Sequence, residues 1–107
     1  MWDYKALPKA GAVETTDLSI GVSYSYDSST REFISYDNVA VTKAKGDYIK
    51  SKGLGGAMFW ETSGDRTDGQ SLIGTIAGSF AGLEQTQNLL SFPASQYANL
   101  VAGMPGE

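Results

Sequence analysis

The sequence predicts an α/β fold that is incomplete within this chain. Three observations predict it: a helical pattern over residues 39–52, a short apolar run from Leu54 to Glu61 directly after it, and a further helical pattern from Ser71 onward. A helix, a strand buried on both faces and a second helix form the repeat of parallel α/β proteins. Because one buried parallel strand cannot form a sheet alone, its neighbours are expected to lie outside these residues.

The part of the chain before this repeat predicts a β-hairpin. Residues 2–7 suit a short helical turn, which Pro8 ends. Residues 19–27 alternate between larger and smaller side chains, which is typical of a strand. The segment 27–30 is rich in turn-forming residues, and residues 31–36 supply a second strand. The order is therefore hairpin, helix, buried strand, loop and helix.

The large side chains of the hairpin allow two interpretations. They share one face of the first strand, which we predict to be its packed face: Ile20, Val22, Tyr24 and Tyr26. Alternatively, tyrosines line a groove, because a tyrosine combines apolar area with a hydroxyl group. The tyrosines in question are Tyr24, Tyr26 and Tyr36.

The helix is predicted to run from Val39 to Lys52. Asp37 and Asn38 precede it and are residues that cap a helix N-terminus well. Gly53 follows it and can adopt the left-handed conformation that ends helices. The lysines in and after this helix are interpreted as a solvated face and not as a binding patch: Lys43, Lys45, Lys50 and Lys52.

Glycines surround the predicted strand and the helix after it. The segment 53–56 is not a phosphate-binding loop, since such loops follow a strand and open a helix, whereas this one does the reverse. Ser71 is the expected cap of the next helix, and a short last helix is expected to start at Pro93. The apolar stripe of the helix that follows Ser71 would be Leu72, Ile76, Phe80 and Leu83. Gly74, Gly78 and Gly82 share another face, which predicts close approach of a neighbouring backbone.

Composition excludes several classes of function. The net charge of −4 and the scattered basic residues argue against nucleic-acid binding. Cysteine and histidine are both absent, which removes thiolate chemistry, the usual base of a catalytic triad and the commonest metal ligands. We therefore expect no metal and no cofactor. No apolar run is long enough to cross a membrane and no secretory signal is visible, so no membrane partner is expected.

Trp60 and Glu61 are the candidate site residues. They end the apolar run before a polar loop, where α/β barrels place their active sites. An indole offers a flat platform for the C–H face of a sugar ring, although core packing is the alternative for a lone tryptophan. Glu61 and Asp65 resemble the paired carboxylates of glycosidases, but a loop carboxylate that bonds the backbone or Arg66 is the favoured interpretation of Asp65.

Several segments resemble family 18 glycoside hydrolases, the chitinases, especially fungal ones. Residues 2–8 and 34–38 are similar to parts of the small α+β insertion of these enzymes and to its return to the barrel. The most specific similarity is the Gly-Gly-Ala-Met-Phe-Trp-Glu segment over residues 55–61, which looks like the last barrel strand. The resemblance implies the C-terminal part of a (β/α)8 TIM barrel. It divides the chain into a part of the α+β insertion with the hairpin (1–37), the last helix–strand–helix unit of the barrel (38–87) and a C-terminal tail (88–107).

The resemblance also implies roles for single residues. Trp60 would form the floor of the subsite for the sugar at the cleaved bond, and Glu61 would support the site or contact substrate. The family cleaves chitin by a substrate-assisted retaining mechanism, in which a glutamate of an Asp-x-x-Asp-x-Asp-x-Glu strand is the acid. That motif is absent, so no catalytic residue is expected in this chain and the chain alone is expected to be inactive.

Three hypotheses about function remain at this point. In the first, the chain is part of a chitinase. The partners of the chain are then chitin or chito-oligosaccharides and the upstream remainder of the barrel, and the resemblance alone implies an extracellular location. The second is a non-catalytic carbohydrate-binding or scaffold piece of a chitinase-like protein. The third is a self-standing small α+β protein without a sugar ligand, which would have to fold cooperatively by itself.

Overall fold

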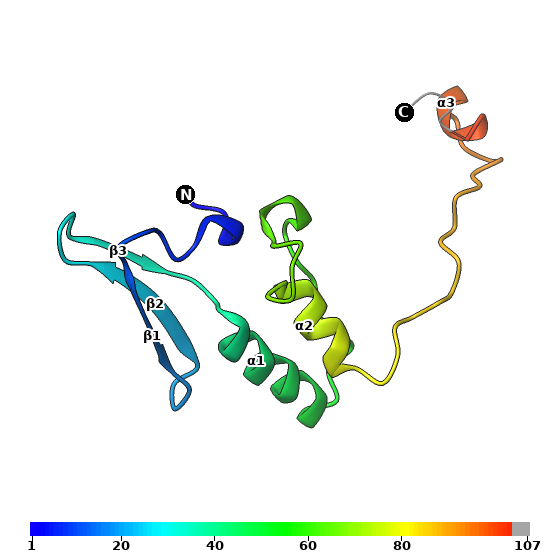
Figure 1. Cartoon of the computed structure of the whole chain (residues 1–107). Coiled ribbons are helices and arrows are strands. Elements are labelled where there is room, and N and C mark those ends of the chain that lie inside the picture. The colour runs from blue at the N-terminus through cyan, green and yellow to red at the C-terminus, as the bar shows by residue number, and fades with distance from the viewer. Residues whose placement is uncertain (104–107) are drawn as a thin grey trace.

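The computed structural model describes residues 1–103. A three-stranded sheet lies beside two helices that run side by side in the same direction, and a long irregular tail leads to a last short helix (Figure 1). The elements are η1 (Tyr4–Ala6), β1 (Val13–Asp17), β2 (Val22–Asp27), β3 (Glu32–Ser35), α1 (Val39–Ser51), η2 (Thr62–Gly64), α2 (Leu72–Ser79) and α3 (Ala98–Val101). The predicted turn near the N-terminus is confirmed as η1, whereas the last helix begins at Ala98 and not at Pro93.

The sheet is antiparallel with strand order β1-β2-β3. The predicted hairpin is confirmed, because β2 pairs with β3 in a register that places Tyr26 opposite Phe33. The strand β1 was not predicted, and it pairs with β2 through contacts such as Val13 opposite Tyr26. Its residues are all exposed and mostly polar, so it lacks the apolar alternation that indicates a strand.

The packed face of the hairpin is the opposite of the predicted one. Ser23 and Ser25 are buried, at 2% and 1% exposure, whereas Tyr26 on the other face is 43% exposed. The reason is the backbone entering α1, which lies against β2 at this point. The hydroxyl of Ser23 donates to the carbonyl of Tyr36 (2.5 Å) and accepts from the Asn38 N–H (3.0 Å). Only a small side chain fits between the sheet and this backbone.

The helix α1 begins and ends where local signals predict. The side chain of Asn38 accepts a hydrogen bond from the Val41 N–H at 3.1 Å, so Asn38 is the N-cap. Gly53 has a positive φ of 61°, the conformation expected of a residue that ends a helix. The lysines of this helix are exposed, as predicted, and Lys43 pairs with Asp47 one turn later at 2.8 Å.

The helices α1 and α2 contact each other directly, and the glycine at their contact is Gly46. A Cβ atom at this position would lie 3.0 Å from Ser79 Oγ and 3.2 Å from Ile76 Cδ1. The predicted close approach at Gly74, Gly78 and Gly82 is wrong: Gly74 and Gly78 are exposed and Gly82 lies beyond the end of α2. Sequence spacing alone does not tell which of two neighbouring helices carries the glycine that allows their close approach.

The apolar run expected to form a buried strand does not form one. Leu54 to Glu61 has no strand partner among residues 1–103, and its large side chains are exposed, with Met58 at 81%. Strands need a hydrogen-bonding neighbour, and among residues 1–103 the strands β1 to β3 pair with one another and not with this run. The barrel part of the predicted fold is therefore not formed within the described residues. The helix expected from Ser71 is confirmed with Ser71 as its cap, but it ends at Ser79, before Phe80 and Leu83.

The described part of the chain buries little apolar surface. Its buried apolar side chains are Leu7, Val41 and Ile76. The radius of gyration is 19.0 Å, compared with about 13 Å for a compact domain of about 100 residues. Within residues 1–103, no helix has the length and apolar character needed to cross a bilayer.

Candidate functional site

The segment around Trp60 borders a hollow of about 350 Å³ that is rich in aromatic and carboxylate side chains. We call it the aromatic hollow and define it by the residues Trp2, Asp3, Tyr4, Phe59, Trp60, Glu61 and Asp65. The indole of Trp60 is 91% exposed, so core packing of this tryptophan does not occur in the described structure. Both predicted site residues, Trp60 and Glu61, therefore lie at the same hollow.

Two contacts join the N-terminal segment to the loop that follows Trp60. The Lys5 ammonium donates to the carbonyl of Ser63 at 2.6 Å, and the Tyr4 hydroxyl donates to the carbonyl of Gln70 at 3.0 Å. The segment that contains η1 and the loop that contains η2 accordingly lie side by side (Figure 1). These contacts bring Trp2 and Trp60, which are far apart in the sequence, to the edges of one hollow.

Glu61 is held by its own loop. Its carboxylate accepts a hydrogen bond from the hydroxyl of Ser63, and Thr62 and Ser63 lie in the short helical turn η2. The peptide bond between Trp60 and Glu61 is cis. A carboxylate fixed at the rim of a hollow beside an exposed indole can accept hydrogen bonds from a ligand while the indole contacts its apolar face.

Asp65 also lines the hollow, but its bonds are structural, as the favoured interpretation of this residue predicts. Its carboxylate accepts from the Ser71 hydroxyl (2.7 Å) and from the backbone N–H groups of Leu72 (2.9 Å) and Ile73 (3.1 Å) at the start of α2. Burial alone would raise the pKa of Asp65, but the hydrogen bonds to its charged form outweigh this and lower the pKa below its usual value. Arg66 pairs with Asp68 instead.

Removing the Asp65 carboxylate is expected to weaken α2 in a pH-dependent way. Asp65→Ala should lower the free energy of unfolding by about 0.5–2 kcal/mol near neutral pH, the usual cost of losing a helix cap. Because the folded-state pKa is lowered, this stabilisation is present above the ordinary pKa and is lost as the pH falls through the lowered one. Urea titrations from about pH 6 down to about pH 2 should show the wild-type advantage shrinking.

The isosteric variant Asp65→Asn is the control for this experiment. It keeps the shape and one acceptor but does not titrate, so its own stability should not depend on this group as the pH falls. A wild-type advantage over Asp65→Ala that stays constant down to the lowest pH would contradict an ionised cap.

Trp2 is fixed by two charged residues of the hairpin region. The ammonium of Lys9 lies 4.2 Å from the centre of the indole ring, and the indole Nε1 donates to Glu32 Oε1 at 3.3 Å. Lys9 and Glu32 are themselves an ion pair with 2.6 Å between Nζ and Oε2. The hydrogen bond from Lys9 lowers the pKa of Glu32, which stays ionised near neutral pH. Nothing in the sequence pattern indicated this cluster, because its members are up to 30 positions apart.

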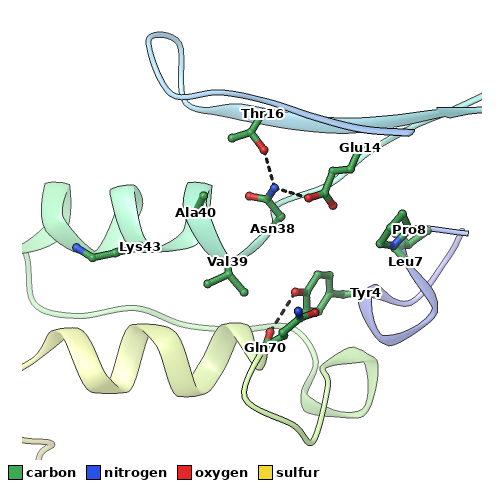
Figure 2. Close-up of a pocket in the computed structure, with 10 residues that line it drawn as sticks. All are labelled: Tyr4, Leu7, Pro8, Glu14, Thr16, Asn38, Val39, Ala40, Lys43 and Gln70. Carbon is green, nitrogen blue, oxygen red and sulfur yellow. Dashed lines mark hydrogen bonds between the residues drawn. The ribbon is translucent and has the colours of Figure 1, made fainter. Parts of the chain in front are cut away.

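A second cavity, of about 550 Å³, lies between the sheet, the start of α1 and the N-terminal segment. Figure 2 shows the amide of Asn38 pointing at Glu14 and Thr16, to which it donates at 2.8 and 2.7 Å. The hydroxyl of Tyr36 donates to the other oxygen of Glu14. Burial, followed by this bond to a carboxylate, raises the pKa of Tyr36. The cluster was missed because Glu14 and Thr16 belong to β1, which was not predicted.

The geometry suits ligand contact and shows no complete catalytic unit. Within residues 1–103, no group of three metal-ligating side chains could hold a metal ion. Each carboxylate at the hollow already has a partner: Asp65 bonds the start of α2, Glu61 accepts from the Ser63 hydroxyl, and Asp3 pairs with Lys5 at 3.4 Å. The aromatic hollow therefore offers an apolar platform with acceptors around it.

The chain belongs to the glycosyl hydrolases family 18. The model of that family matches residues 1–65, which include the N-terminal segment, the hairpin, α1 and both predicted site residues. The family expected from the sequence is thus confirmed. The matched region ends at Asp65, whose carboxylate accepts from the first N–H groups of α2.

Individual relatives agree with this assignment. The chain is 53% identical over 100 residues to Endochitinase 1 of Metarhizium robertsii, covering 94% of this chain and 24% of the relative. It is 47% identical over 104 residues to Chitinase 1 of Aphanocladium album, covering 97% of this chain and 25% of the relative. The structure of Chitinase ChiA74 from Bacillus thuringiensis matches 72% of this chain and 14% of its own, with a TM-score of 0.63 and 42% identity.

The chain therefore spans about a quarter of the length of these two fungal relatives. Its structure matches part of a chitinase of known structure, although the described residues form a small sheet and helices and not a barrel.

Proposed function

We propose that this chain is part of a chitinase that hydrolyses β-1,4 linkages between N-acetylglucosamine units of chitin. Its membership of family 18 and its similarity to two fungal chitinases support the proposal. The mechanism would be the substrate-assisted, retaining one, in which the substrate's own acetamido group is the nucleophile. The catalytic acid would come from polypeptide outside these residues, since the chain lacks the motif that carries it.

Trp60 would supply the platform for a sugar ring. The observation that carries this proposal is an indole 91% exposed at the edge of a hollow that also holds carboxylate acceptors. A pyranose ring has an apolar C–H face and a rim of hydroxyl groups, so an indole below it and acceptors beside it match both parts. Glu61, held by Ser63, would accept a hydrogen bond from a hydroxyl or amide of the sugar.

The remaining polypeptide of a barrel would cover the exposed apolar segment before Trp60. Leu54 and Met58 are 54% and 81% exposed, and exposed apolar side chains of this density mark interaction surfaces. The division into insertion (1–37), barrel part (38–87) and tail (88–107) belongs to the same proposal. In it, residues 54–61 become a strand once a neighbouring strand supplies hydrogen bonds.

A chimera tests whether these residues serve a chitinase. The 107-residue chain replaces the matching quarter of the M. robertsii enzyme, whose sequence is 53% identical over this region. The chimera should hydrolyse colloidal chitin and soluble N-acetylglucosamine oligomers. A folded chimera that binds these oligomers without cleaving them would favour the alternative function, a non-catalytic carbohydrate-binding piece.

In the active chimera, Trp60→Ala is expected to lower kcat/KM for a soluble oligomer about tenfold to a hundredfold. Truncation of a well-placed aromatic at a binding site costs about 2 kcal/mol or more. Trp60→Phe should retain part of the activity because a smaller aromatic face remains. Unchanged kinetics in Trp60→Ala would show that this residue is no platform, whatever the activity of the chimera.

A further inference from the structure

We propose that Trp2 is a second sugar-contacting residue, which lines the aromatic hollow together with Trp60 and is held in place by Lys9 and Glu32. The proposal rests on the proposed function and assigns a further residue to its binding site. The chain contains two tryptophans, and both line this one hollow although they are 58 positions apart in the sequence. The contacts of Lys5 with Ser63 and of Tyr4 with Gln70 bring them together.

The orientation of the Trp2 ring is set before any ligand arrives. Lys9 lies over the ring at 4.2 Å from its centre, and Glu32 accepts from the indole nitrogen at 3.3 Å. Lys9 is not among the residues that line the hollow, whereas Trp2 is. The ammonium thus covers a part of the indole away from the hollow, while the side chain remains 50% exposed.

A ring held in this way loses little freedom when a ligand binds. Ordering a mobile side chain opposes association, so a platform that is already fixed binds more tightly than a free one. The ion pair between Lys9 and Glu32, at 2.6 Å, keeps both holding groups in place. Lys9 and Glu32 are therefore positioning residues, which act through Trp2.

The charge of the hollow selects the class of sugar. Its carboxylates are Asp3, which pairs with Lys5 at 3.4 Å, Glu61 and Asp65, so acidic groups outnumber the one basic group at its rim. Such a surface accepts hydrogen bonds from hydroxyl and amide N–H groups and repels carboxylates. The ligand is accordingly an uncharged, amide-bearing oligosaccharide, as N-acetylglucosamine oligomers are, and not an acidic one.

The test observes both tryptophans directly in the full chain. The protein is labelled with 5-fluorotryptophan, and its two ¹⁹F resonances are assigned with Trp2→Phe and Trp60→Phe. Titration with the tetramer of N-acetylglucosamine should shift both resonances with one common Kd. An oligogalacturonate of the same length should shift neither.

Calorimetric titrations with the same tetramer measure the contribution of each residue. We expect Trp2→Ala to raise the Kd about tenfold, and Lys9→Met and Glu32→Gln to raise it about threefold each. The matched control is Tyr48→Ala, which removes another exposed aromatic with a lysine over its ring, Lys52 at 5.8 Å, but on α1 away from the hollow. Its Kd should equal that of the wild type.

The outcomes separate this inference from the proposed function. If the tetramer shifts the Trp60 resonance alone and Trp2→Ala binds like the wild type, the role of Trp2 is wrong while the platform role of Trp60 stands. If neither resonance shifts, the role of Trp2 is wrong, whereas the proposed function is decided separately by the activity of the chimera. The ¹⁹F titration is carried out on the wild-type sequence. It therefore still tests the role of Trp2 if the Trp2→Ala variant does not fold.

Discussion

Asn38→Ala is expected to lower the free energy of unfolding by about 2–4 kcal/mol. The substitution removes the N-cap of α1, which usually costs about 0.5–2 kcal/mol. It also removes the amide that donates to Glu14 at 2.8 Å and Thr16 at 2.7 Å, and the loss of two hydrogen bonds of about 0.5–1.5 kcal/mol each adds about 1–3 kcal/mol. Urea unfolding followed by circular dichroism measures the sum.

Asn38→Asp separates the two contributions. An aspartate keeps the acceptor that caps α1 but cannot donate to Glu14, and its charge faces that carboxylate. The variant should therefore be destabilised at neutral pH in spite of its intact cap. Asn88→Ala, in the exposed tail, is the control and should match the wild type. An Asn38→Asp protein as stable as the wild type would show that the amide bonds between the sheet and α1 contribute nothing.

Gly46→Val is expected to separate α1 from α2 and to cost about 1–3 kcal/mol or more. Even a Cβ atom at this position would lie 3.0 Å from Ser79 Oγ and 3.2 Å from Ile76 Cδ1, and valine adds two further methyl groups. Ile76 is one of the buried apolar side chains of the described residues. Its displacement should expose apolar surface, which thermal unfolding and binding of a hydrophobic dye both detect.

Gly78→Ala is the matched control for Gly46→Val, with the opposite expected sign. It lies in α2, and a Cβ atom there would meet nothing within 4 Å. Alanine in a helix is more favourable than glycine by about 0.5–1 kcal/mol, so this variant should gain stability. Equal effects of the two substitutions would contradict the contact between α1 and α2 at Gly46.

Sequence reasoning succeeded where a structural signal is local. The caps Asn38 and Ser71 and the helix end at Gly53 depend on side chains that bond their own neighbourhood, and all three are confirmed. It failed where the structure of a segment depends on contacts with residues distant in the sequence. Residues 54–61 were predicted to form a buried strand, but a strand requires a neighbour, and none of the described strands pairs with this segment. The packed face of β2 was reversed because small serines, and not tyrosines, fit against the backbone entering α1.

The candidate site was predictable only in part, because some of its signals are local and others join distant residues. Trp60 and Glu61 stand out in the sequence because an apolar run ends at them, and they do lie together at one hollow. Their roles as platform and acceptor stay predictions. The cluster of Trp2, Lys9 and Glu32 could not be predicted, because its members come from three different elements or loops and no spacing rule connects them.

The contacts that close the aromatic hollow have a consequence for the order of assembly. The bonds from Lys5 to Ser63 and from Tyr4 to Gln70 span 58 and 66 positions, whereas the hairpin and α1 form from neighbouring residues. Closing so long a loop carries an entropic cost that grows with its length, and two hydrogen bonds at exposed sites offset little of it. The hairpin and α1 are thus expected to fold early on the ribosome, before residues 61–70 have left it. In the finished protein the hollow would be the first part to open, and amide exchange should be faster in the loop after Trp60 than in β2.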